Sequence, residues 1–124
     1  MDIENKISYD IRGAAFKINK ALGPGLLESV YETALAHELR KMQHSVKTQA
    51  MLQVEYDGII MEQGFRIDLL IDDLVIVEVK SIEALSPTHH KQLLTYLKLS
   101  KKKLGLLINF NVLSLKNSIV RIVN

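Results

Sequence analysis

Charged side chains interrupt two strongly apolar segments in the middle of this sequence. Asp68 lies within the apolar run 67–71, and Glu78 and Lys80 lie at the end of the apolar run 74–80. Because side chains alternate along a strand, Glu78 and Lys80 would share one face of a sheet. Removing a charge from water costs several kcal/mol unless it is paired or bound to a metal ion. These charges therefore indicate a functional site.

The short connection between the two runs determines how the carboxylates would meet. Asp72 and Asp73 join the runs in a turn, so an antiparallel pairing would place Asp68 opposite Glu78, at a Cβ separation of ~5–8 Å. Two carboxylates at that distance repel each other unless a cation lies between them. Such oxygen ligands suit Mg²⁺ or Mn²⁺ better than zinc.

A simpler interpretation of the same charges stays open. Many antiparallel sheets have one solvated face, and the three charged residues would belong to such a face together with Arg66. Leu70 and Ile76 would share that face. A mixed apolar and ionic surface fits the floor of a cleft better than an open surface.

A helix after this region would supply further polar groups. Ser86 is a good N-terminal cap and Pro87 suits the first helical position. His89, Gln92 and Tyr96 follow at spacings of three and four, so they would project from one helix face. An amide and a phenol can contact a phosphate or orient a lysine without adding charge. For His89 we favour an ordinary exposed position.

The elements that would position these residues follow from the spacing of the apolar side chains. We expect two amphipathic helices around the break Gly23-Pro24-Gly25. The second would bury Leu27, Val30, Ala34, Leu35, Leu39 and Met42. We then expect strands over 51–56, 59–62, 65–71 and 74–80, a helix over 87–100, and strands over 104–110 and 118–123, with a hairpin turn at Asp57-Gly58. The element order ααββββαββ predicts a single α/β (α+β) domain over residues 1–124.

Length and composition exclude several classes of protein. The chain has 124 residues, 48% hydrophobic and 24% charged, which is typical of one globular domain. We find neither an apolar run of about 18 residues nor a signal peptide, and without cysteine there is no disulfide or thiolate zinc site. We therefore expect a cytoplasmic protein. The net charge of +2 permits nucleic-acid binding without indicating it. The lysines at 98 and 101–103 would form a solvated helix end, with phosphate contact as an open alternative.

These motifs, taken in order, resemble a known superfamily. Asp68, then Glu78-Val79-Lys80, then Gln92 and Tyr96 resemble the D…E-x-K…Q-x-x-x-Y order of the PD-(D/E)XK nuclease superfamily. The segment 25–31, GLLESVY, is similar to the motif of the GxxExxY family, a branch of that superfamily. The similarity runs from about residue 11 to residue 123. It implies a restriction-endonuclease-like αβββαβ core, with a mixed β-sheet flanked by helices. No proline precedes Asp68, as is common in these proteins.

The resemblance implies a metal site. Asp68 and Glu78 would bind the divalent ion, Mg²⁺ or Mn²⁺, and the carbonyl of Val79 would be a third ligand. Glu28, from the second helix, would complete or orient the ligands of the ion.

The resemblance also implies catalytic roles. Lys80 would stabilise charge on the phosphate or lower the pKa of the attacking water. Gln92 and Tyr96 would position Lys80 and the scissile phosphate. For Tyr31 two roles stay open, packing in the core or acting in the site.

Two classes of function follow from this site. The first is an enzyme that hydrolyses phosphodiester bonds in nucleic acid, with DNA favoured over RNA as the substrate. No membrane partner is expected. The second is a catalytically silent module that keeps the nuclease fold and binds nucleic acid or a protein. So short a chain leaves little room for substrate recognition, so a homodimer or a protein partner would supply specificity.

Overall fold

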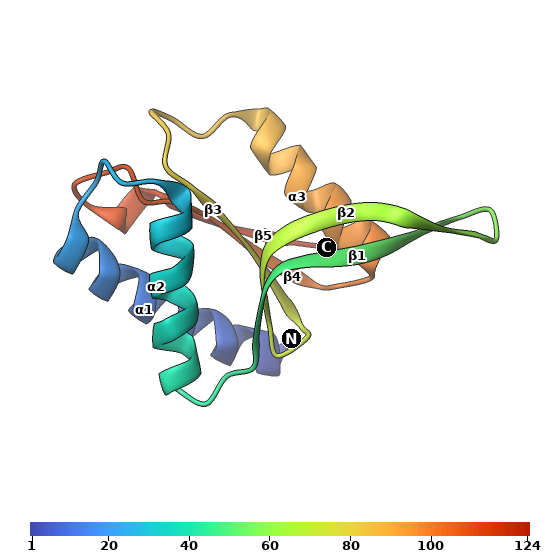
Figure 1. Ribbon diagram of the computed structural model, residues 1–124, viewed down its shortest axis with the longest axis horizontal. Helices are drawn as coiled ribbons and strands as arrows, with labels where there is room; N and C mark the ends of the chain where they lie inside the picture. Colours follow the sequence, from blue (N-terminus) through green and yellow to red (C-terminus); the bar gives the residue numbers. More distant parts are fainter.

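The computed structural model describes residues 1–124, apart from the side chains of Glu62 and Gln63. A five-stranded mixed sheet lies between helices (Figure 1). The elements are α1 (Asp2–Leu22), α2 (Glu28–Lys41), β1 (Val46–Tyr56), β2 (Ile59–Ile71), β3 (Val75–Lys80), α3 (Pro87–Ser100), β4 (Leu104–Asn109), the 3₁₀ turn η1 (Leu115–Asn117) and β5 (Ile119–Val123). The strands lie in sequence order, and only β3 and β4 are parallel, with α3 as their crossover.

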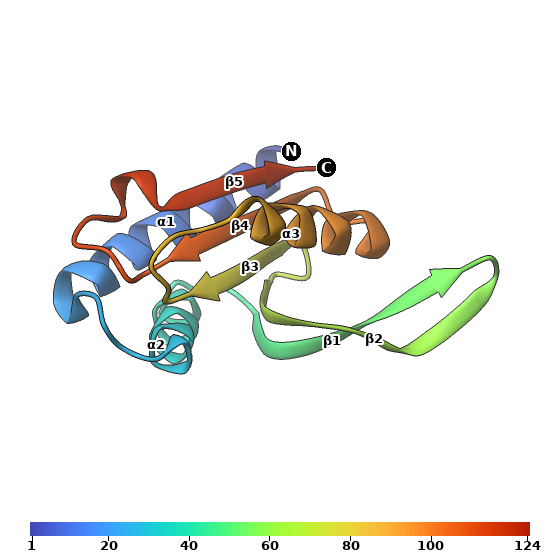
Figure 2. The ribbon, with the colours of Figure 1, turned by 90° about the horizontal axis from the view of Figure 1, so that it is seen from above.

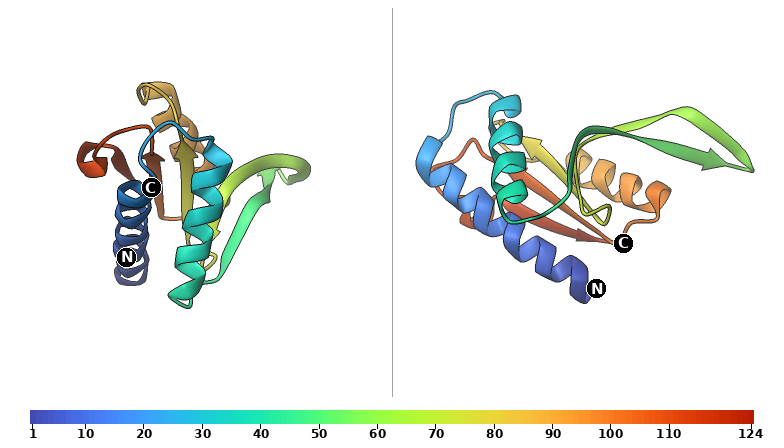
Figure 3. Two further views of the ribbon diagram at one scale, coloured as in Figure 1. Left: turned by 60° about the vertical axis from the view of Figure 1, so that its left-hand side comes forward. Right: turned by 60° about the horizontal axis from the view of Figure 1, so that its bottom comes forward.

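Helices cover both faces of the sheet (Figure 3). On one face, Val77 and Val79 of β3 pack in the core formed with α1 and α2. On the other face, Ile76 packs with Leu93 and Leu97 of α3. Because both faces are covered, β3 is apolar at nearly every position, and the mixed α/β architecture predicted from the sequence is confirmed. Among the described residues, no helix is long and apolar enough to cross a membrane.

The predicted apolar stripe of the second helix is partly wrong. Leu27, Val30 and Met42 are 74%, 40% and 44% exposed. Leu35 and Leu39 are buried as predicted, and Tyr31 and Ala36 complete the buried face of the helix. Leu27 and Met42 are the N-cap and C-cap residues of α2, so both lie at its ends rather than on its buried face.

The number of strands before α3 also differs from the prediction. The segments expected as separate strands over 59–62 and 65–71 form one strand, β2. Gly64 lies within it, and a Cβ there would be 1.7 Å from the carbonyl oxygen of Leu52 on β1. Glycine thus permits a close approach at a register shift rather than ending the strand. The predicted turn at Asp57 and Gly58 is confirmed, with φ of 51° and 79°.

Candidate functional site

The site lies where β2 separates from β3. The two strands pair from Ile71 and Val75 only as far as Leu69 and Val77, and β2 then leaves with β1 as a long ribbon (Figure 2). The next pair in this register would be Asp68 and Glu78. The Asp68 Oδ2 atom accepts a hydrogen bond from the Val79 backbone N–H at 2.8 Å. The Asp68 carboxylate therefore satisfies an amide that the β2 backbone no longer reaches.

Glu78 is the most strongly perturbed acid described in this region. Glu78 is 6% exposed, and its buried Oε1 atom has no hydrogen-bond partner among the described residues. Burial, followed by the hydrogen bond and the charge of Asp68, raises the pKa of Glu78 to about 9, although the charge of Lys80 lowers it. Near neutral pH, the metal-free pair therefore holds a proton.

Lys80 and Tyr96 approach this pair from β3 and α3. Lys80 is partly buried at the end of β3, and its carbonyl accepts a hydrogen bond from the Phe110 amide at 2.9 Å. The ring of Tyr96 stacks on Phe65 of β2 with centroids 4.3 Å apart. Burial raises the pKa of the Tyr96 phenol, and the charges of Glu78 and Asp68 add to this effect. The field of both carboxylates therefore reaches the phenol.

The start of α2 is tied to the end of β3 beside the same site. The exposed Glu28 accepts a hydrogen bond through Oε2 from the Ser81 amide at 3.1 Å. The hydroxyl of Ser81 donates to the carbonyl of Leu26 at 2.6 Å. Glu28 is thus hydrogen-bonded to the residue that follows Lys80.

Tyr31 packs rather than facing the site. It is fully buried and stacks on Phe110, with ring centroids 4.7 Å apart. Its hydroxyl donates to the Gly23 carbonyl at 2.6 Å and accepts from the Leu26 amide at 3.2 Å. Tyr31 therefore holds the loop that leads to Glu28.

Two residues of this region were missed by the sequence analysis. Glu32 lies one helical turn after Glu28, and both its carboxylate oxygens accept hydrogen bonds from Gln49 Nε2, at 3.0 and 2.9 Å. The same nitrogen is 3.4 Å from Asp68 Oδ1. Burial raises the pKa of Glu32, the Gln49 hydrogen bond lowers it, and the charges of Asp68 and Glu28 raise it. The spacing of Glu28 and Glu32 was a usable signal for the second acid, whereas nothing in the sequence marked Gln49.

Two of the predicted residues on α3 form no hydrogen bond with either carboxylate among the described residues. Gln92 is exposed on α3, and its amide makes no hydrogen bond with any described residue. Its role beside Lys80 stays a prediction. His89, in contrast, closes a capping box, because its Nδ1 atom accepts a hydrogen bond from the Ser86 amide at 3.0 Å. His89 therefore stabilises the start of α3.

The donor atoms fit a hard divalent cation of the magnesium type. In the part of the chain that the structure describes, no group of three or more His, Asp or Glu side chains is arranged to hold a metal ion. Mg²⁺, however, is usually held by one or two carboxylates and completes its shell with water. Asp68 and Glu78 supply two carboxylates, and the buried Oε1 atom of Glu78 is an acceptor that has no donor among the described residues. The pair therefore suits such an ion.

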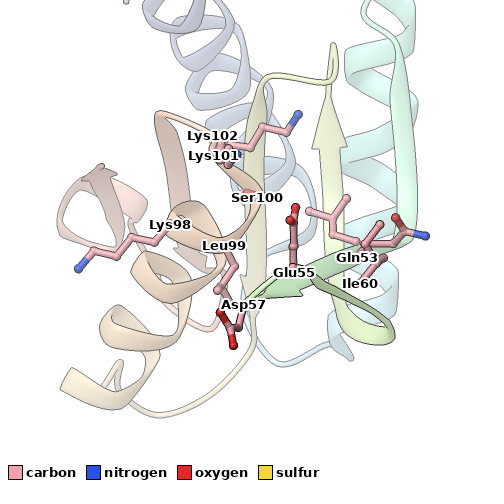
Figure 4. A pocket seen from close by; sticks show the side chains of 11 residues that line it. Gln53, Glu55, Asp57, Ile60, Lys98, Leu99, Ser100, Lys101 and Lys102 are labelled. Atoms are coloured by element: carbon pink, nitrogen blue, oxygen red, sulfur yellow. The ribbon is translucent and has the colours of Figure 1, made fainter.

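A separate cleft lies away from this site. It has a volume of about 510 Å³ and lies between the C-terminal end of α3 and the β1–β2 ribbon (Figure 4). Lys98, Lys101 and Lys102 line one side, and Glu55 and Asp57 line the other. The side chain of Lys98 extends away from these acids in Figure 4. The cleft contains none of the candidate catalytic residues, so we do not place the chemistry there.

A mixed sheet between helices, with paired carboxylates and a lysine where two strands separate, is consistent with a restriction-endonuclease-like fold. Residues 5–122 match the family model described as the PD-(D/E)XK nuclease superfamily. No match was found among curated proteins or among solved structures. The chain belongs to the PD-(D/E)XK nuclease superfamily.

Proposed function

We propose that this protein is a metal-dependent nuclease that hydrolyses phosphodiester bonds in nucleic acid, with DNA favoured over RNA. The observation that carries the proposal is the pairing of Asp68 with the buried Glu78, whose Oε1 atom has no partner among the described residues. Lys80 lies on the same strand close enough for its charge to lower the pKa of Glu78. Superfamily membership supports a nuclease-like function.

Metal binding would fall to the carboxylates of Asp68 and Glu78 and to the carbonyl of Val79. When bound, Mg²⁺ or Mn²⁺ would polarise the phosphate and acidify a coordinated water. Glu28, fixed by its hydrogen bond to the Ser81 amide, would orient water at the edge of this shell.

Charge on the phosphate would be stabilised by the Lys80 ammonium, because cations placed where negative charge develops lower the barrier. The Tyr96 phenol, held by its stack on Phe65, would position Lys80 and the phosphate. Gln92 would join them once substrate covers its face of α3.

The segment 25–31 supports assignment to the GxxExxY branch of the superfamily. Its glutamate contacts the end of β3 and its tyrosine fixes the preceding loop. We further propose that residues 1–124 act as one domain in the cytoplasm, and that a second copy or a protein partner supplies sequence specificity.

The second candidate is a binding module that keeps the fold without catalysis. Two observations favour it: no metal-binding group of three acids or histidines exists among the described residues, and Gln92 is exposed. This module would bind nucleic acid or protein with no need for a divalent ion.

Cleavage of labelled DNA and RNA panels separates the two candidates. The protein is incubated with Mg²⁺, Mn²⁺ or EDTA, beside Asp68→Ala and Lys80→Ala. Glu83→Ala is the matched control, since Glu83 is exposed and makes no hydrogen bond or ion pair with any described residue. If the protein is an enzyme, cleavage should require the metal ion, and Asp68→Ala and Lys80→Ala should lose it while Glu83→Ala keeps it. Binding without cleavage by the wild-type protein would favour the module.

A further inference from the structure

Gln49 has an unusual backbone conformation in the middle of β1. Its φ is 49°, in the left-handed region that residues other than glycine, asparagine and aspartate rarely adopt. The strand pairs on either side of it are Thr48 with Leu69 and Ala50 with Ile67, so Gln49 itself faces Asp68. Such backbone strain is often found at functional sites, so it indicates a functional role for the Gln49 side chain.

The Gln49 amide joins two carboxylates that would otherwise repel each other. Its Nε2 atom donates to both oxygens of Glu32, at 3.0 and 2.9 Å, and lies 3.4 Å from Asp68 Oδ1. The other Asp68 oxygen accepts from the Val79 amide at 2.8 Å. The Asp68 carboxylate is therefore held from β1 on one side and from β3 on the other.

A neutral amide suits this position for a physical reason. An amide nitrogen carries two donor hydrogens, so it can bridge two acceptors without adding a charge that would compete with a cation. Glu32, anchored on α2, fixes the amide from behind. A lysine in the same place would neutralise the acids and weaken their attraction for a metal ion.

We propose that Gln49 is a positioning residue of the nuclease site, and that Glu32 orients its amide so that Asp68 is held ready to bind the metal ion. In this backbone conformation the Gln49 side chain contacts Glu32 on α2 and Asp68 on β2. This inference rests on the proposed function, because it concerns metal binding by Asp68.

The test measures metal affinity apart from cleavage. In Gln49→Met the side chain keeps a similar length but has no donor. We would titrate Mn²⁺ into the full chain and record the concentration that gives half of the rise in melting temperature. Loss of a group that orients a metal ligand typically weakens metal affinity by about 10–100-fold, and we expect a shift in this range.

Gln43 provides a matched control. It is a second exposed glutamine with positive φ, 71°, and its side chain makes no hydrogen bond with any described residue. Gln43→Met should leave the Mn²⁺ titration unchanged. The pair Gln49→Gly and Gln43→Gly relieves the backbone at both positions, so both should stay folded, and only Gln49→Gly should need more Mn²⁺.

Coupling to Glu32 gives a further readout. Glu32→Ala should raise the Mn²⁺ concentration needed for half of the rise in melting temperature, as Gln49→Met does. The double variant should need no more Mn²⁺ than the single variant that needs the most, because the two side chains act as one unit. Fully additive losses would overturn the bridging role.

The possible failures can be distinguished. If the wild-type protein binds Mn²⁺ and cleaves while Gln49→Met and Gln49→Gly titrate like it, only the role of Gln49 is overturned. If the wild-type melting temperature ignores Mn²⁺ and nothing is cleaved, the proposed function is overturned and this inference with it.

Discussion

Replacing Glu78 with glutamine should change how the stability of the metal-free protein depends on pH. Glutamine keeps the shape of the side chain but cannot ionise. Burial, followed by the hydrogen bond and charge of Asp68, raises the pKa of Glu78 from 4.5 to about 9. The folded protein therefore holds a proton that the unfolded chain releases above pH 4.5.

The sign follows from linkage. A carboxyl group whose pKa is raised on folding contributes most favourably below its unfolded pKa of 4.5, and its contribution falls until the pH passes about 9. One proton corresponds to about 1.4 kcal/mol per pH unit. At pH 7 the Glu78 site would therefore cost roughly 3 kcal/mol of unfolding free energy relative to acid conditions, an upper bound because the site can relax and admit water.

Urea denaturation in EDTA, at several pH values between 5 and 8, measures this directly. The unfolding free energy of the wild-type protein should fall with pH more steeply than that of Glu78→Gln, by up to about 1.4 kcal/mol per unit. Glu83→Gln should follow the wild-type protein. Saturating Mn²⁺ should displace the proton and remove the difference in slope. Parallel pH profiles for wild-type and Glu78→Gln proteins in EDTA would refute the reasoning.

Three further variants test other parts of the structure. Lys80→Ala should keep the Mn²⁺-dependent rise in melting temperature but lose cleavage, because both acidic ligands remain; loss of the thermal shift would contradict this. Burial lowers the pKa of His44, but hydrogen bonds to Asp72 and Asp10 raise it overall above 6.5. The stabilisation from these two hydrogen bonds is complete below pH 6.5 and is lost as the pH rises through the folded pKa of His44. His44→Ala should therefore lower the unfolding free energy, measured by urea denaturation, by about 1–3 kcal/mol more at pH 5.5 than at pH 9. An equal loss at both pH values would exclude a charged His44. Gly64→Ala should cost at least about 1–3 kcal/mol, since its Cβ would lie 1.7 Å from a backbone oxygen of β1; an unchanged melting temperature would show that the ribbon adjusts freely.

The predictable part of the site depends on local rules. Alternation along β3 and a tight turn at Asp72 and Asp73 are enough to place Asp68 beside Glu78. Local rules do not determine the position of Gln92 in the same way. Helical spacing fixes which residues share a face of α3, but not how α3 is rotated and shifted against the sheet, and that depends on packing by Leu93 against the glycine at 105.

The proposed role of Gln49 could not be predicted from the sequence for a related reason. A strand with regular alternation would give no indication that one residue adopts positive φ, and glutamine has no marked preference for that region. Gly64 misled the prediction in the opposite direction, because glycine both ends strands and permits close approaches within them. Both residues break a local rule near the point where the ribbon leaves the sheet.

The sequence also explains why the sheet opens at this place. Toward the turn, β2 and β3 pair through Leu70, Ile71, Val75 and Ile76, all buried, so separating them there would expose apolar surface. One residue beyond Leu69 the facing pair is Asp68 and Glu78. Glu78 is already only 6% exposed, so closing the sheet over the pair would remove the remaining hydration of the Asp68 carboxylate. Pairing is therefore favourable up to Leu69 and unfavourable beyond it. Where the strands separate, Asp68 is partly exposed while Glu78 is buried. A divalent ion bound by both acids would hold β2 to β3 at the point where their pairing ends, so metal binding and the stability of the base of the ribbon should be coupled.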